Sequence, residues 1–246
     1  MNRLSCNSSD RSKATPRSKE NTASAYHHGD LRKTLIAASL ELVAEGENWN
    51  FSLREVARRA GVSHNAPYSH FAHKRDLLAA AAGAGRDLLR GQLMTAMAGI
   101  ADPLAALRRL GAAWINFGAK NPALYRLMFS AAHSGPDWRP EQVLAAGVAT
   151  RALLEDIFRR GARSGVFPPR LARESELQNA ALCTWATVHG LTMLAIDGLA
   201  NVGDISSEGF GQKIVAIITR GLGPNEASAA EINRVKAKTR AVKAGR

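Results

Sequence analysis

A group of side chains in the first third of the chain has the types and spacing that read DNA. His64 and Asn65 lie in the first turn of a predicted short helix, and each side chain both donates and accepts hydrogen bonds. Ala66 offers a methyl group that suits contact with a thymine methyl, and Tyr68 lies one turn further on. Lys74 begins the next predicted helix, where its charge and the free backbone N–H groups favour a phosphate oxygen. These residues predict an interface for double-stranded DNA.

Two predicted helices must position these side chains. Ser52 and Glu55 form a Ser-x-x-Glu capping box that starts the first helix, and Gly61 ends it. Ser63 is the expected N-cap of a second helix that runs to about Phe71. Two short helices joined by a glycine-containing turn are a helix-turn-helix, whose second helix enters the major groove.

Each of these residues also has an ordinary structural interpretation. His64 and Asn65 are equally explained as polar first-turn residues that face solvent. Tyr68 and Phe71 are candidates for the hydrophobic core, Phe71 more strongly than Tyr68. A single lysine such as Lys74 is most often a solvated surface charge. The joint arrangement of these residues after the turn favours the DNA interpretation over the separate ones.

The rest of the sequence predicts an all-α protein. Apolar residues recur with a helical period between Asp30, the expected N-cap, and Gly46, the expected stop. No run of alternating β-branched residues follows. Proline and glycine breaks separate the further helices expected at residues 74–100, 103–118, 122–132, 140–164, 174–198 and 207–222.

Composition limits the class of protein. The chain has 246 residues, of which 46% are hydrophobic, so it can bury a core. Its net charge of +12 favours an anionic partner such as nucleic acid. Its two cysteines form no disulfide scaffold and show no zinc-ligand spacing, which predicts a reduced, cytoplasmic protein with no metal and no cofactor. No uninterrupted apolar stretch reaches about 18 residues, so no membrane span and no membrane partner are expected.

Catalytic motifs are missing from the sequence. There is no Gly-x-Ser-x-Gly, no His-Glu-x-x-His, no glycine-rich phosphate loop and no carboxylate pair at a useful spacing. An enzyme is therefore the disfavoured alternative.

The segment Tyr26–Leu78 resembles the N-terminal domain of TetR-family transcriptional regulators. Its signature, Gly-Val-Ser-x-x-x-x-Tyr-x-His-Phe-x-x-Lys, is filled by residues 61–74, and Tyr26-His27-His28-Gly29-Asp30-Leu31-Arg32 is similar to the lead-in of one branch. Pro67 departs from the pattern, in which a long aliphatic residue is commoner. The resemblance implies a bacterial DNA-binding regulator whose DNA contacts are Ser52, Ser63, His64, Asn65, Ala66, Tyr68, His70 and Lys74.

The second half resembles the C-terminal domain of that family named for a Trp-x-x-x-His-Gly element. Residues 185–190 read Trp-Ala-Thr-Val-His-Gly, and residues 121–129 also fit. The resemblance implies a homodimer formed by the last two helices, which binds a palindromic operator as a repressor and is released by an unknown small-molecule inducer. Apolar faces on these helices are consistent with a dimer; their members are Leu177, Ala181, Trp185, Val188, Thr192, Ile214, Val215, Ile217 and Ile218.

The inducer site is predicted from bulky or polar-tipped side chains on the central helices. The candidates are Trp114, Phe117, Tyr125, Met128, Phe129, Trp185, His189 and Met193. An aromatic and methionine stripe at helical spacing is more often core than pocket. His189 could donate to a ligand, but a satisfied interior histidine or a dimer contact is the favoured interpretation. A constitutive or architectural regulator without a ligand stays as an alternative.

The expected organisation has four segments. Residues 1–24 are a disordered basic arm, residues 25–78 a three-helix helix-turn-helix DNA-binding domain, residues 79–222 a helical ligand-binding and dimerisation domain, and residues 223–246 a basic tail. The arm is either inert or a contact to the adjacent minor groove.

Overall fold

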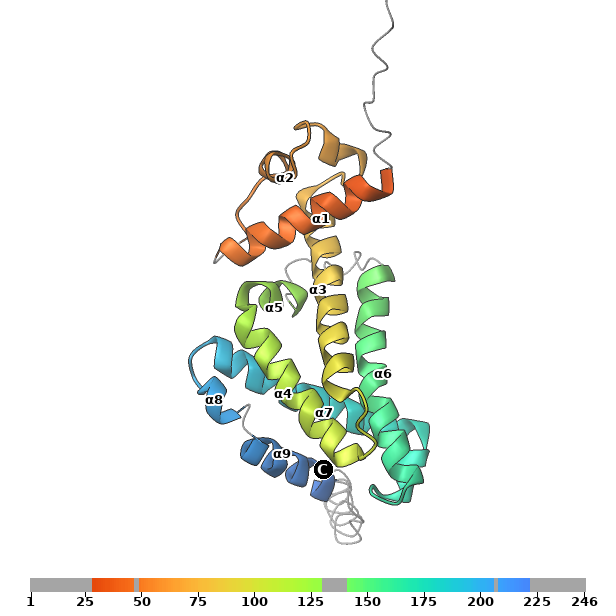
Figure 1. The fold of residues 1–246 in the computed structure, drawn as a ribbon. Helices are drawn as coiled ribbons and strands as arrows, with labels where there is room; N and C mark the ends of the chain where they lie inside the picture. Colours follow the sequence, from red (N-terminus) through yellow and green to blue (C-terminus); the bar gives the residue numbers. More distant parts are fainter. Residues whose placement is uncertain (1–27, 47–48, 130–140, 206–207, 222–246) are drawn as a thin grey trace, which may run out of the picture.

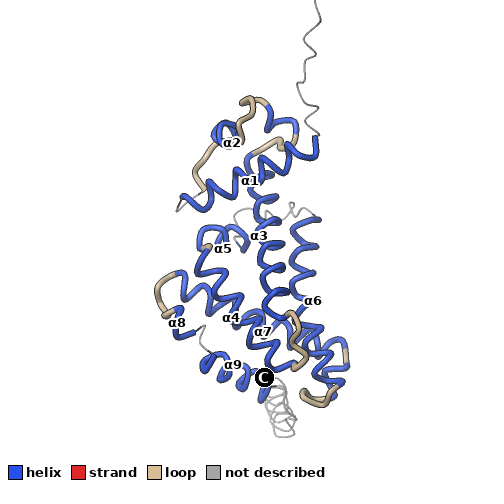
Figure 2. The backbone as a smooth tube through the Cα atoms, viewed as in Figure 1, coloured by secondary structure: helices blue, strands red, loops and turns tan. Residues whose placement is uncertain are grey.

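The computed structural model describes residues 28–46, 49–129, 141–205 and 208–221, and every regular element in these ranges is helical (Figures 1 and 2). The all-α prediction is confirmed. The predicted basic arm and basic tail lie outside the described residues. The helices are α1 (His28–Glu45), α2 (Leu53–Arg59), α3 (Lys74–Met97), α4 (Pro103–Lys120), α5 (Pro122–Phe129), α6 (Glu141–Arg163), α7 (Glu174–Ile196), α8 (Val202–Ile205) and α9 (Glu208–Gly221), with 3-10 turns η1 (Ala66–Ser69) and η3 (Pro169–Ala172).

Helices α1 and α2, turn η1 and the start of α3 form the N-terminal headpiece. The Ser52 Oγ accepts a hydrogen bond from the Glu55 N–H at 3.2 Å, which caps α2. Gly61 follows α2 with a φ of +68°, a left-handed conformation that favours glycine. Arg59 ties α2 to α1 through an ion pair with Glu45 at 2.6 Å. The headpiece core is built from Leu35, Val43, Phe51, Leu53, Val56, Phe71 and Leu77, all buried.

The second element of the helix-turn-helix differs from its prediction. Sequence predicts an α-helix capped by Ser63 and running to Phe71, whereas the structure has only the 3-10 turn Ala66–Ser69. Pro67 explains the difference, because it has no N–H to donate to the Ser63 carbonyl, as an α-helix requires. Ala66 donates to that carbonyl instead, at 2.9 Å, in an i to i−3 bond. The first helix also differs, because α1 begins at His28 and Asp30 lies inside it rather than at its N-cap.

Helix α3 connects the headpiece to the C-terminal helices and is continuous across the expected domain boundary at residues 78–79. Figure 1 shows it as the central axis, with the headpiece at one end and α4, α5 and α6 around the other. It packs on α1 in the headpiece and on α4, α5 and α6 in the C-terminal domain. A movement of α3, or of the helices packed on it, therefore changes contacts in both the headpiece and the C-terminal domain.

Helices α4, α6 and α7 form the core of the C-terminal domain. Helix α4 packs on α3 and α7, and α7 packs on α6, while α9 lies against α4. Several residues that the sequence analysis assigned to a dimer face are buried within one protomer instead: Leu177, Ala181, Val188, Thr192 and Val215. That assignment is corrected, because these side chains are already covered by the helices of their own chain.

Helix α7 has the length and mean hydropathy of a membrane span, although His189 and Gly190 interrupt its apolar residues. Its best window has a mean hydropathy of 1.2, and 28% of that window is buried. A core helix of a soluble protein passes the same test, and α7 packs against both α4 and α6. The finding is therefore weak support for a membrane span.

Candidate functional site

The turn between α2 and α3 presents the polar residues that the sequence singled out. Ser63, His64 and Asn65 are exposed, and the Tyr68 side chain is 53% exposed. Pro67 and Phe71 point the other way and are buried, so this short turn is anchored on the headpiece core. Phe71 is therefore a core residue, as its structural interpretation predicted. Tyr68 lies at the surface, where its hydroxyl can reach a groove wall or a phosphate of DNA.

Ala66 and His70 are half-buried at the ends of η1, and Ser52 is exposed at the N-terminus of α2. The His70 ring lies 6.5 Å from the Phe71 ring, between centroids, so it borders the core rather than projecting fully outward. The Ser52 hydroxyl already accepts the Glu55 N–H. DNA contact by these three residues stays a prediction.

Lys74 is engaged inside the headpiece. Its Nζ donates to the carbonyl of Trp49 and lies 5.0 Å from the centroid of the Phe51 ring. Burial lowers the pKa of Lys74, and the negative charge of Glu55 offsets part of this shift. The geometry gives this ammonium group a bracing role between the loop before α2 and the start of α3, and its predicted phosphate contact stays untested.

Sequence reasoning left out two arginines on the exposed side of α2. Arg54 and Arg58 are four residues apart, so they share one helix face, and both are exposed. Arg58 makes a long ion pair with Glu55, at 3.9 Å, and its side chain is 75% exposed. The signal was readable in the sequence, because Arg54 and Arg58 directly follow the apolar residues Leu53 and Ala57.

A buried hydrogen-bonded cluster lies in the C-terminal domain. The Trp114 Nε1–H donates to the Tyr125 Oη at 2.8 Å, and the same oxygen lies 2.8 Å from the His189 Nδ1. Because Tyr125 accepts from Trp114, its own proton is free to be donated to His189, which requires a neutral ring with the proton on Nε2. Burial lowers the pKa of His189, which favours that neutral form. Tyr125 is fully buried, and burial raises its pKa to about 12. Hydrogen bonds with Trp114 and Thr192 lower this pKa and so offset part of the effect of burial.

Phe129 is the centre of an aromatic cluster beside these hydrogen bonds. Its ring centroid lies 4.7 Å from that of Tyr125, 4.7 Å from that of His189 and 6.3 Å from that of Trp185. Phe129, Trp185 and His189 each keep some exposure. The structure thus brings together Trp114, Tyr125, Phe129, Trp185 and His189 from α4, α5 and α7. Among the other candidates, Phe117 and Met128 are buried core residues and Met193 is half-buried.

Arg86 on α3 joins this cluster and was missed by sequence reasoning. One of its nitrogens, Nη2, donates to the Met128 carbonyl near the end of α5, and the guanidinium carbon lies 5.7 Å from the Phe129 ring centroid. Burial lowers the pKa of Arg86. The sequence showed Arg86 only as one of several charged residues in an Ala-rich helix, and nothing in that pattern indicated that α5 would pack over it.

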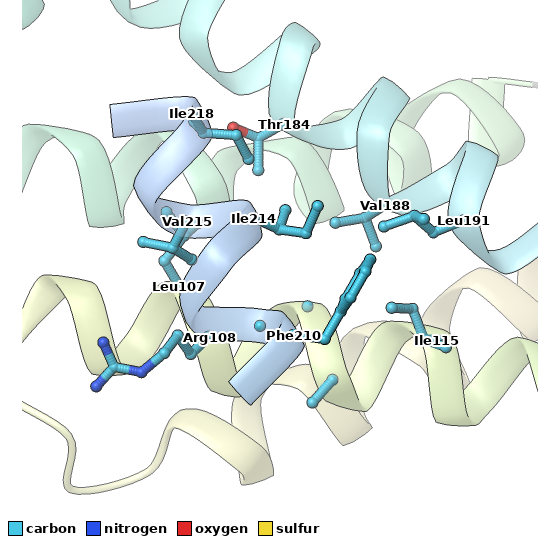
Figure 3. A pocket seen from close by; sticks show the side chains of 13 residues that line it. Leu107, Arg108, Ile115, Thr184, Val188, Leu191, Phe210, Ile214, Val215 and Ile218 are labelled. Carbon is cyan, nitrogen blue, oxygen red and sulfur yellow. The ribbon is translucent and has the colours of Figure 1, made fainter. Parts of the chain in front are cut away.

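A separate shallow groove lies between α4, α7 and α9 (Figure 3). Phe210, Ile214, Val188 and Leu191 line it, with Arg108 at its edge. Its free volume is about 30 Å³, far below the 300–1,000 Å³ that is common for ligand sites. None of the predicted inducer residues lines this groove. In the described ranges, no group of three or more His, Cys, Asp or Glu side chains has a metal-binding arrangement.

Comparisons with known protein families match both parts of the chain. Residues 35–81 match the bacterial regulatory proteins of the tetR family, and residues 107–216 match a tetracyclin repressor-like C-terminal domain. The fold and the exposed helix-turn-helix define a DNA-binding transcription regulator with a helical C-terminal domain. The chain belongs to the TetR family. This confirms the family resemblance seen in the sequence.

Solved structures share the fold of this chain. A Rhodococcus protein of unknown function is 30% identical, with 81% of this chain and 98% of that chain covered and a TM-score of 0.66. The TetR-family regulator PfmR from Thermus thermophilus is 24% identical, covering 77% of this chain and 98% of its own, with a TM-score of 0.54. The regulator FadR from Bacillus subtilis, in complex with stearoyl-CoA, is 14% identical, covering 78% and 99%, with a TM-score of 0.58. The search of curated proteins found no match.

Proposed function

We propose that this protein is a transcriptional repressor that binds a palindromic operator as a homodimer and is released from it by a small molecule. The observation that carries the DNA-binding part is the surface made by His64, Asn65 and Tyr68, which is exposed at the helix-turn-helix and anchored by buried Pro67 and Phe71. Polar groups held on a packed scaffold can meet base edges with little loss of entropy on binding. Such a regulator acts in the cytoplasm, on bacterial DNA, without catalysis.

The exposed side of α7 supports the homodimer. Leu182 and Leu194 are 50% and 43% exposed, and exposed Ala186 lies between them at helical spacing. On α9, Ile217 is 65% exposed. Exposed large apolar side chains on α7 and α9 are typical of an interface, and a two-fold axis would place the same surface on both partners.

The aromatic cluster supports release by a ligand. Phe129, Trp185 and His189 are packed together but not closed off, and they lie on α5 and α7 rather than in the headpiece. The indole N–H of Trp49 in the headpiece donates to the Ala123 carbonyl on α5 at 3.3 Å. A ligand that moves α5 therefore acts on a direct headpiece contact. By linkage, it shifts DNA binding by no more than its differential affinity for the two conformations.

The test compares alanine variants on the DNA upstream of the gene and on random DNA. We expect His64→Ala and Asn65→Ala to reduce mainly the discrimination between the two DNAs, by about 1–3 kcal/mol each. Tyr68→Ala and Lys74→Ala should weaken binding to both DNAs. Arg109→Ala, at an exposed position on α4, is the matched control. An equal loss on both DNAs for all four variants would contradict this division of roles.

A further inference from the structure

Arg86 is a half-buried cation that forms no ion pair with any carboxylate in the described part of the chain. Its Nη1 is inaccessible to solvent and has no hydrogen-bond partner, although Nη2 donates to the Met128 carbonyl. Arg90, one turn further along α3, has a buried Nε that also lacks a partner. Within the described part of the chain, no carboxylate forms an ion pair with either side chain. Burying an unpaired charge is costly, because its lost hydration is not replaced.

The surroundings of Arg86 indicate what would replace the missing partner. A guanidinium group stays protonated in proteins and presents five N–H donors in one plane, which match the two oxygens of a carboxylate or phosphate. The Phe129 ring lies beside it, followed by the rings of His189 and Trp185. Phe129, Trp185 and His189 retain exposed surface, so an apolar group can lie against them.

We propose that Arg86, assisted by Arg90, binds the anionic group of a small organic acid whose apolar body packs on Phe129. The ligand class is an oxyanion carried on an apolar skeleton. This inference deepens the proposed function, on which it rests, by naming the chemistry of the releasing molecule. It also gives Arg86 a regulatory position, because the carbonyl that it holds belongs to α5, and the other end of α5 accepts the Trp49 hydrogen bond.

The test measures binding by calorimetry on the full chain without DNA. The probes are benzoate, phenylacetate and octanoate, with benzamide as the neutral match of benzoate and inorganic phosphate as the bare anion. We expect at least one carboxylate to bind, with benzamide and inorganic phosphate each at least about tenfold weaker, because charge-assisted hydrogen bonds contribute on that scale. Equal binding of benzoate and benzamide would overturn the proposal, as would equal binding of inorganic phosphate or failure of all three carboxylates.

Variants assign the site. Arg86→Gln should weaken carboxylate binding by about tenfold or more, and Arg86→Lys should restore part of it, since the charge returns without the planar fork. Arg170→Gln is the matched control: Arg170 also has a buried Nε without a partner, but it lies on η3, which packs on α6 and α7 rather than on α5. Unchanged binding in Arg86→Gln, or an equal loss in Arg170→Gln, would contradict the assignment.

Thermal unfolding without ligand shows whether Arg86→Gln still folds. Because the substitution removes a half-buried charge that has no ion-pair partner among the described residues, we expect its midpoint to lie within about 4 °C of the wild type. A collapse of the midpoint would mean that Arg86 is a structural residue that caps α5, and would overturn the proposal.

A parallel DNA-release assay separates the two proposals. Carboxylate binding without release of the upstream DNA would support the anion site and contradict ligand-controlled repression. Release by benzamide but not by benzoate would support ligand control and contradict the anion site.

Discussion

At the scale of single residues, Tyr125 joins the hydrogen bonds and the aromatic packing of the C-terminal domain. Its hydroxyl accepts from Trp114 and faces His189, and its ring packs on Phe129. It is fully buried, so no water replaces a lost partner. The order of the cluster therefore depends on one hydroxyl group.

We expect Tyr125→Phe to destabilise the protein by about 2 kcal/mol, because the substitution leaves the Trp114 N–H and the His189 Nδ1 without this partner. For a protein of this size, that corresponds to a fall in thermal midpoint of roughly 4–8 °C. The matched control is Tyr68→Phe, which removes the same atom from a side chain that is 53% exposed. Equal midpoints for the two variants would show that the buried hydrogen bonds contribute nothing measurable.

The neutral state of His189 predicts a pH dependence of stability. Burial lowers its pKa below the ordinary value of 6.5, so the unfolded chain binds a proton more readily than the folded one. The stabilising contribution is complete above about pH 6.5 and is lost as the pH falls toward and through the folded pKa. We expect the thermal midpoint of the wild type to fall more between about pH 7.5 and about pH 5.5 than that of His189→Asn. A fall of the same size in both proteins would exclude His189 as the cause.

Residue roles were partly readable from the sequence. The exposed position of Tyr68 and the buried position of Phe71 follow the helical spacing after Gly61, so both were open to prediction. The partner of Lys74 was not, because the Trp49 carbonyl lies 25 positions away and the contact exists only after α1, α2 and α3 have packed. The contacts of Arg86 were not predicted for the same reason, since its neighbours Met128 and Phe129 are on α5.

At the scale of elements, glycine sets how closely α4 approaches its neighbours. A Cβ atom at Gly118 would lie 2.1 Å from the Thr192 Cγ2 of α7 and 3.1 Å from the Tyr125 ring of α5. Only a residue without a side chain allows these three helices to meet there. The same contact holds Tyr125 and Thr192 beside His189.

We expect Gly118→Ala to cost about 1–3 kcal/mol, since the added methyl must displace α7 or Tyr125. Gly91→Ala on α3 is the matched control: its Cβ would have no neighbour within 4 Å. This control should gain about 0.5–1 kcal/mol from better helix propensity. Chemical denaturation of both variants measures the difference, and a stabilised Gly118→Ala would contradict the packing described for α4 and α7.

Element boundaries were largely predictable because proline and glycine mark them. The predicted helices at 103–118 and 174–198 correspond to Pro103–Lys120 and Glu174–Ile196. The single-turn elements α8 and η3 were missed, because four residues carry too little periodicity to detect. The 3-10 form of η1 follows from Pro67, whose missing N–H was already visible in the sequence.

At the scale of the whole molecule, the exposed apolar surface of α7 and α9 predicts a dimer. We expect Leu182→Glu to give monomers in sedimentation and to lower affinity for a palindromic operator by at least about 100-fold, because each headpiece then binds alone. The matched control is Leu88→Glu, since Leu88 on α3 is 52% exposed and lies outside this surface. A dimeric Leu182→Glu would place the interface elsewhere.

Which face of α7 meets a partner was not predictable from the sequence. Helix α7 is apolar on several sides, so Leu177 and Leu182 look alike in the pattern. Only the packing of α4 and α6 decides that Leu177 is covered within the protomer and Leu182 is not.

The central claim is sequence-specific DNA binding by the headpiece. Its most direct test is a titration of the purified full chain on the DNA upstream of its gene, with random DNA as competitor, over a range of salt concentrations. We predict a preference of about a thousandfold or more for the upstream DNA. Equal, steeply salt-dependent binding to both DNAs would contradict the claim, because neutralisation of phosphates alone produces that result.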